Sequence, residues 1–61
     1  MTVWLKPVPH DWHSILESHP GLHIWFSCGL RVDYVTDAPT ATNPPPLGRC
    51  HDCARIVGVP L

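Results

Sequence analysis

The sequence predicts a small β-rich domain that is stapled by a metal ion. Three observations support this: a Cys-x-x-Cys pair at Cys50 and Cys53, a third cysteine followed by glycine at Cys28, and β-branched and aromatic residues between positions 22 and 35. Two thiols separated by two residues can bind one metal ion, and a third thiol supplies another ligand. A chain of 61 residues buries only about 60% of its unfolded surface, so its core is marginal. A structural zinc contributes an apparent ~10–16 kcal/mol to folding.

Residues 1–10 are predicted to form an extended N-terminal arm or an edge strand. Pro7 and Pro9 lack amide donors, so we do not expect this segment inside a sheet. Trp4 and Trp12 are large apolar side chains for so small a protein. They either cap the core or provide a surface that binds a partner.

Residues 11–21 fit two patterns. In the first, Asp11 caps a short helix that ends at Pro20-Gly21. In the second, residues 12–18 form a strand, the chain turns at Pro20-Gly21, and residues 22–28 return beside it. The β-branched and aromatic content of residues 22–28 favours a strand there, and a strand needs a partner.

The hairpin pattern brings His13 to Cys28. With a two-residue loop at Pro20-Gly21, His13 lies directly opposite Cys28, and with a four-residue loop at 18–21 it lies diagonal to Cys28 on the same face. The longer loop is favoured, because Pro-Gly prefers a type II turn that matches hairpin twist poorly. His23 is an odd number of residues from Cys28, so we expect it on the opposite face.

The remaining elements follow in order. Residues 30–35 alternate as a third strand, with Leu30, Val32 and Tyr34 on one face. Residues 37–48 form a Pro-rich loop, in which positions 44–46 are expected to be an extended, solvated polyproline II spacer. The Cys-x-x-Cys knuckle leads into a short C-terminal helical turn, after which residues 57–61 could return to the sheet. The whole chain, 1–61, is predicted to be one domain.

The predicted metal ligands are His13, Cys28, Cys50 and Cys53. A tetrahedral zinc site needs four ligands, and the three cysteines leave one position for a histidine or water. His13 ranks first for this position and His23 second, with His10 and His19 below them. His51 lies inside the knuckle, where its side chain is expected to face solvent. A mixed site of one histidine and three cysteines favours zinc over iron.

These motifs resemble a group of small zinc-binding proteins of actinobacteria and their phages. The resemblance covers residues 12–57 and is carried by four segments: Trp12-His13, Ser27-Cys28-Gly29, residues 35–39, and Cys50-His51-Asp52-Cys53-Ala54. The long interval between His13 and Cys28 and the insertion at residues 44–46 depart from the pattern. The resemblance implies a zinc-ribbon-like or knuckle fold with one structural zinc ion, and it implies no biochemical activity.

The sequence favours a protein-interaction module over an enzyme or a nucleic-acid-binding protein. Catalytic zinc sites need an open position and a general base, but the chain has no His-x-Glu motif and Glu17 is its only glutamate. We therefore expect no catalytic residues and no cofactor other than zinc. Three tryptophans and near-neutral charge suit apolar contact with a host protein or a second copy. The resemblance to proteins of actinobacterial phages implies that this role would be phage-encoded and host-directed.

Nucleic-acid binding through a zinc ribbon is the alternative function. Arg31, Arg49 and Arg55 could cluster near the metal, with Trp25 or Phe26 stacking on bases. Four basic residues against five acidic ones make a weak electrostatic footprint for this role. No apolar run approaches the roughly 20 residues of a membrane span and no signal-peptide pattern is present, so a cytoplasmic location without membrane contact is expected.

Overall fold

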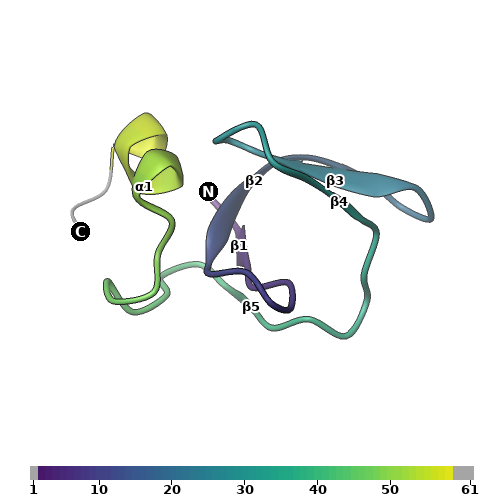
Figure 1. Cartoon of the computed structure of the whole chain (residues 1–61), viewed down its shortest axis with the longest axis horizontal. Coiled ribbons are helices and arrows are strands. Elements are labelled where there is room, and N and C mark those ends of the chain that lie inside the picture. Colours follow the sequence, from purple (N-terminus) through teal and green to yellow (C-terminus); the bar gives the residue numbers. More distant parts are fainter. Residues whose placement is uncertain (1, 59–61) are drawn as a thin grey trace.

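A computed structural model describes residues 2–58 and shows a curled antiparallel sheet followed by one short helix (Figure 1). The elements are β1 (Trp4–Leu5), β2 (His13–His19), β3 (His23–Phe26), β4 (Arg31–Asp33), β5 (Thr40–Ala41) and α1 (His51–Val57). The sheet order is β4-β3-β2-β1-β5. The predicted fold class is confirmed: the domain is small and β-rich, with a hairpin, a third strand, a Cys-x-x-Cys knuckle and a short C-terminal helix.

The hairpin of β2 and β3 decides between the two patterns for residues 11–21 in favour of a strand. His19 pairs with His23, so the loop holds three residues, 20–22. The Leu22 amide donates to the His19 carbonyl (2.9 Å) and Gly21 has φ 81°, as a type II turn requires. The expectation of a four-residue loop is therefore wrong. The type II turn forms, and Leu22 adds the one residue that lets the strands resume pairing beyond it.

A β-bulge in β2 sets which side chains face the end of β3. Near the turn, Glu17 pairs with Trp25, but Ile15 pairs with Phe26, so Leu16 has no partner in the ladder. The extra residue shifts the register by one position, which exchanges the two faces of the strand. Beyond the bulge, the Ser27 amide donates to the Ser14 carbonyl (2.9 Å). The same register continues to His13 and Cys28, which places them opposite each other.

The N-terminal arm contributes an interior strand. β1 lies between β2 and β5, with Leu5 opposite His13. The expectation of an edge strand or an extended arm outside the sheet interior is corrected for β1, because Pro7 and Pro9 lie beyond this two-residue strand and remove none of its ladder bonds. Trp4 is only 2% exposed and belongs to the core. Of the two roles expected for Trp4, the structure supports the core role, whereas Trp12 is half-buried.

The third strand agrees with the alternation in the sequence. Leu30, Val32 and Tyr34 are half-buried against the core, while Arg31 and Asp33 are exposed. β4 pairs with β3 and forms one edge of the sheet. The core onto which these side chains pack contains residues from both ends of the described chain: Trp4, Leu5, Ile24, Phe26, Cys53 and Ala54.

The Pro-rich segment is anchored to the domain. Thr40–Ala41 forms β5 beside β1, and Pro44 is fully buried. The buried Arg49 side chain donates from Nε to the Pro44 carbonyl and from Nη2 to Asn43 Oδ1, both at 2.8 Å. The expectation of a solvated spacer is therefore wrong for Pro44, although positions 45 and 46 are exposed. The predicted return of residues 57–61 to the sheet falls largely on positions 59–61, which lie outside the described residues.

Candidate metal centre

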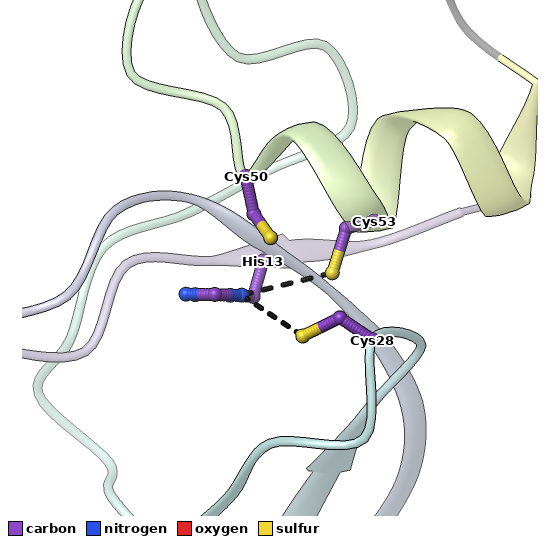
Figure 2. Close-up of side chains that lie close together, drawn as sticks. All are labelled: His13, Cys28, Cys50 and Cys53. Carbon is purple, nitrogen blue, oxygen red and sulfur yellow. Dashed lines mark hydrogen bonds between the residues drawn. The ribbon is translucent and has the colours of Figure 1, made fainter.

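Four side chains from three distant parts of the chain converge at one end of the hairpin (Figure 2). The ligand atoms of His13, Cys28, Cys50 and Cys53 all lie within 4.8 Å of one another. His13 is the first residue of β2, Cys28 follows β3, and the two other cysteines flank the start of α1. The structure thus brings together the same four residues that the sequence pattern selected.

His13 directs its Nδ1 atom at the sulfurs. Nδ1 lies 3.5 Å from Cys28 Sγ and 3.6 Å from Cys53 Sγ (Figure 2). Zinc bond lengths of about 2.3 Å to sulfur and about 2.05 Å to nitrogen place these atoms about 3.6 Å apart in a tetrahedral site. The two distances therefore match the edges of a zinc tetrahedron. The imidazole is held in place by Phe26, whose ring centroid is 5.1 Å away.

Cys28 is presented by a tight turn at the end of β3. The Gly29 amide donates to the Phe26 carbonyl, and the Phe26 amide donates to the Leu30 carbonyl, both at 2.9 Å. Gly29 has φ 96°, a conformation that favours glycine over residues with a Cβ atom. The turn also aims the Leu30 amide at the sulfur of Cys28, an arrangement that stabilises a metal-bound thiolate.

A short parallel bridge between Trp12 and Arg49 positions the knuckle. The Trp12 amide donates to the Gly48 carbonyl (2.9 Å), and the Cys50 amide donates to the Trp12 carbonyl (2.7 Å). Cys50 is thereby fixed beside His13, the next residue of β2. Cys50 is the N-cap of α1 and makes no capping bond with its side chain, and Cys53 follows in the first turn, fully buried.

The surroundings shift the pKa values of three of the donors, and not all in the same direction. Burial lowers the pKa of His13, with a further lowering from His10 and a partial offset from Asp11. Burial raises the pKa of the Cys53 thiol, but hydrogen bonds from Ser14 and Cys28 outweigh it, and the net shift is downward. Burial also raises the pKa of Cys28, to about 11, against the opposing Leu30 amide. The neutral imidazole and the Cys53 thiolate are the forms that bind a metal ion.

Ser14 is a member of this environment that sequence reasoning missed. It is fully buried, and its hydroxyl lies 2.8 Å from the Ser27 hydroxyl in addition to its contact with Cys53. Neighbouring side chains of a strand point to opposite faces, so Ser14 is expected to face away from the ligand His13. The strand pattern therefore gives no reason to include Ser14 in the site. Its burial depends on the curl of the sheet, which brings α1 against β2.

The other histidines are not members of the four-donor cluster. His10 contacts the edge of the His13 ring, with centroids 6.0 Å apart. His19 and His23 lie at the turn end of the hairpin and contact each other. His51 is exposed on α1, as expected for its place inside the knuckle. Among the alternatives for the fourth position, the geometry therefore selects His13.

The donor set fits a metal ion that accepts thiolate and imidazole ligands. Three sulfurs and one nitrogen lie within 4.8 Å of one another, and three cysteines with one histidine is the ligand composition of many structural zinc sites. These four protein atoms suffice for tetrahedral coordination. The arrangement is thus a metal centre that could hold one ion and connect β2, the end of β3 and α1.

The comparisons identify no relative of this chain: no family model, no curated protein and no solved structure matches it. The resemblance to small zinc-binding proteins of actinobacteria and their phages therefore stays a prediction. Among residues 2–58, no helix is long and apolar enough to cross a membrane.

Proposed function

We propose that this chain is a small structural-zinc protein in which one Zn²⁺ ion holds the fold together. The observation that carries the proposal is the convergence of His13 and three cysteines, whose ligand atoms lie within 4.8 Å of one another, with His13 Nδ1 3.5 Å and 3.6 Å from two of the sulfurs. Four protein ligands complete the coordination, whereas catalytic zinc sites keep a position open for water or substrate. The donor count therefore supports a structural role over a catalytic one.

Zinc is favoured by the chemistry of the donors. Thiolate and imidazole ligands in tetrahedral geometry suit zinc, whereas an iron site of the same size would use four thiolates, and magnesium or calcium would need oxygen ligands. No carboxylate belongs to the cluster among the described residues.

Native mass spectrometry with and without a chelator tests this proposal. We expect one tightly bound zinc ion per chain, and we expect EDTA to abolish both the ion and the dispersion of the amide NMR signals. Cys50→Ser is expected to bind zinc at least about tenfold more weakly, since it removes a ligand. His51→Gln, at the neighbouring position, is the matched control and should bind normally. A metal-free chain that keeps its signal dispersion would contradict the proposal.

We further propose that the zinc-stapled scaffold serves as a protein-interaction module, with a host protein or a second copy as partner. Since Trp4 is buried, the contact surface must be supplied by other apolar side chains. Val8 and Leu47 are 90% and 93% exposed, and Leu16 and Leu22 are also exposed. Exposed apolar side chains are candidate contact residues when they gather on one face.

Sedimentation of the zinc-loaded chain tests the second-copy form of this idea. We expect association that rises with concentration and falls in Leu47→Ser and in Val8→Ser, with zinc content unchanged. Thr36→Ser, at an exposed loop position, is the neutral control. A chain that stays monomeric up to about 1 mM, the weak end of specific affinities, would rule out self-association.

Nucleic-acid binding has less support from the arrangement of the cations. Arg49 is buried against the Pro-rich segment, and Arg55 is paired with Asp52 at 2.9 Å. Arg31 lies over the Trp25 ring, 5.5 Å from its centroid, and is the cation best placed for stacking with a base. A titration with single-stranded nucleic acid in a salt series would show a steep loss of affinity if this function were correct.

A further inference from the structure

Two histidines that the sequence offered as metal ligands form a pair of their own at the far end of the hairpin. His19 and His23 are directly opposite each other on β2 and β3, and their ring centroids are 4.9 Å apart. His13 and His19 are the first and last residues of β2. At about 3.3 Å per residue this separates the pair from the cysteine cluster by about 20 Å.

The spacing of the two rings suits one metal ion between them. A metal about 2.05 Å from an imidazole nitrogen lies about 3.2 Å from the ring centroid. Two rings on one ion then have centroids about 4.5 Å apart at a right angle and about 5.2 Å apart at the tetrahedral angle. The observed 4.9 Å lies between these values. The backbone pairing of the strands therefore holds the two rings at a centroid spacing that is compatible with one bridging ion.

Carboxylates flank the pair on both sides. Glu17 Oε2 lies 3.5 Å from His19 Nε2, and Asp33 is opposite His23 in the register of β3 and β4. A metal-binding histidine commonly gives its second ring N–H to a carboxylate, which fixes the ring and makes it a better ligand. With Nε2 of His19 directed at Glu17, Nδ1 remains for a metal ion.

We propose that His19 and His23 form a second, exchangeable site for a divalent transition ion that prefers imidazole ligands, such as Ni²⁺, Cu²⁺ or Zn²⁺. Glu17 orients His19, and water completes the coordination. Both His19 and Glu17 are about half exposed, with side-chain values of 46% and 61%. The ion therefore enters and leaves from solvent without unfolding the domain, unlike an ion in the cluster around the buried Cys53.

Paramagnetic Ni²⁺ locates this site directly. We expect that titration of the zinc-loaded protein with Ni²⁺ broadens the amide signals of residues 17–25 and 31–33 along a saturable curve for one ion per chain, with a Kd below about 1 mM. Signals of Cys28 and Cys53 should be unaffected. His19→Gln and His23→Gln should each weaken binding at least about tenfold, and Glu17→Gln up to about tenfold. His51→Gln removes a histidine elsewhere and should bind Ni²⁺ as the unaltered chain does.

The unaltered chain alone can overturn the proposal, so the result does not depend on whether a variant folds. Absence of saturable Ni²⁺ binding at residues 17–25 would exclude the site. An equal loss of affinity in His51→Gln would also overturn it, because binding would then reflect histidine content. Broadening centred on Cys28 and Cys53 would show that Ni²⁺ had entered the cysteine cluster, and would count against a second site.

Discussion

At the scale of single residues, Ser14 connects the hairpin to the metal centre. The side chain is fully buried between the Ser27 hydroxyl, 2.8 Å away, and the sulfur of Cys53. A hydrogen bond to the sulfur favours the thiolate, which is the form that binds metal. Ser14 therefore supports the centre without being a ligand.

Replacing Ser14 by alanine should weaken zinc binding without preventing it. Loss of the hydrogen bond raises the pKa of Cys53, so we expect affinity to fall about 10–100-fold, the usual range for a group that contacts a ligand. Competition with a chromophoric chelator measures the change. Ser18→Ala, at an exposed position of the same strand, should leave affinity unaltered. Unchanged affinity in Ser14→Ala would show that its contact with Cys53 is energetically neutral.

Zinc affinity should rise with pH. Burial holds the pKa of Cys28 at about 11 in the absence of metal, so at neutral pH zinc must displace its proton. Each displaced proton makes affinity rise about tenfold per pH unit, so we expect at least this slope. Measurements at pH 7 and pH 8 should show this slope, and a pH-independent affinity would contradict it.

Below neutral pH, the lowered pKa of His13 determines whether acidification stabilises or destabilises the domain. Its folded pKa is lowered by burial, so the neutral ring contributes stability that is present above the unfolded pKa and is lost as pH falls through the lowered value. Below pH 6.5, the unperturbed pKa, the unfolded state takes up a proton before the folded state does. We expect the absorption bands of a Co²⁺-substituted chain to disappear on acidification from that pH downward. Bands that persist well below pH 5 would argue against histidine ligation.

At the scale of elements, the bulge at Leu16 decides the face on which His13 lies. Without the shift between Ile15 and Glu17, the register near the turn would place Ser14 opposite Cys28. The three-residue loop and the bulge each displace the pairing by one position, and together they restore the register that a two-residue loop would produce.

Deleting Leu16 should therefore leave the metal centre intact. Leu16 has no partner in the ladder and is 65% exposed. Its removal makes β2 and β3 regular while His13 stays opposite Cys28. We expect its zinc affinity to stay within about tenfold of that of the unaltered chain, a much smaller change than the removal of a ligand would cause. Competition with a chelator measures this affinity.

Deletion of Ser14 is the contrasting variant. It moves His13 by one position and turns its ring away from Cys28, so zinc binding should be lost, beyond the effect of Ser14→Ala. If both deletions behaved alike, the register would not control the centre.

The identity of the four candidate ligands could be predicted from the sequence better than the backbone conformation that brings them together. Spacing showed that Cys50 and Cys53 belong together, and the two-residue period of a strand selected His13 over His23. The sequence carries no comparable signal for the bulge, because Leu16 is an ordinary strand residue. The contacts of Arg49 with Pro44, five residues away, and with the distant Trp4 also leave no periodic pattern in the sequence.

At the scale of the whole molecule, Arg49 holds the Pro-rich segment and the N-terminal strand together. Its guanidinium donates to the Pro44 carbonyl and to Asn43, and lies 5.7 Å from the Trp4 ring centroid. It also directly precedes Cys50. A buried cation with a planar set of donors therefore fixes the segment that delivers the last two sulfurs to the centre.

Arg49→Lys should destabilise the domain. A lysine ammonium cannot reproduce the Nε and Nη2 bonds, so a buried carbonyl loses its donor at a cost of about 1–3 kcal/mol. Chemical denaturation of the zinc-loaded chain measures the free energy of unfolding. Arg31→Lys, at an exposed site, is the matched control and should change it by less than about 0.5 kcal/mol. Equal values for the two variants would show that the Arg49 bonds contribute little.

The spread of the four donors over positions 13, 28, 50 and 53 has a consequence for biosynthesis. A ribosome adds roughly 5–20 residues per second, and until Cys53 has left its exit tunnel the nascent polypeptide offers an incomplete set of ligands. Until then the hairpin supplies only two of the four ligands, His13 and Cys28, and it stays exposed to proteases and chaperones. Maturation of this protein should accordingly begin only after nearly all of the described chain has been translated, and its pace should depend on how much free zinc the cell maintains.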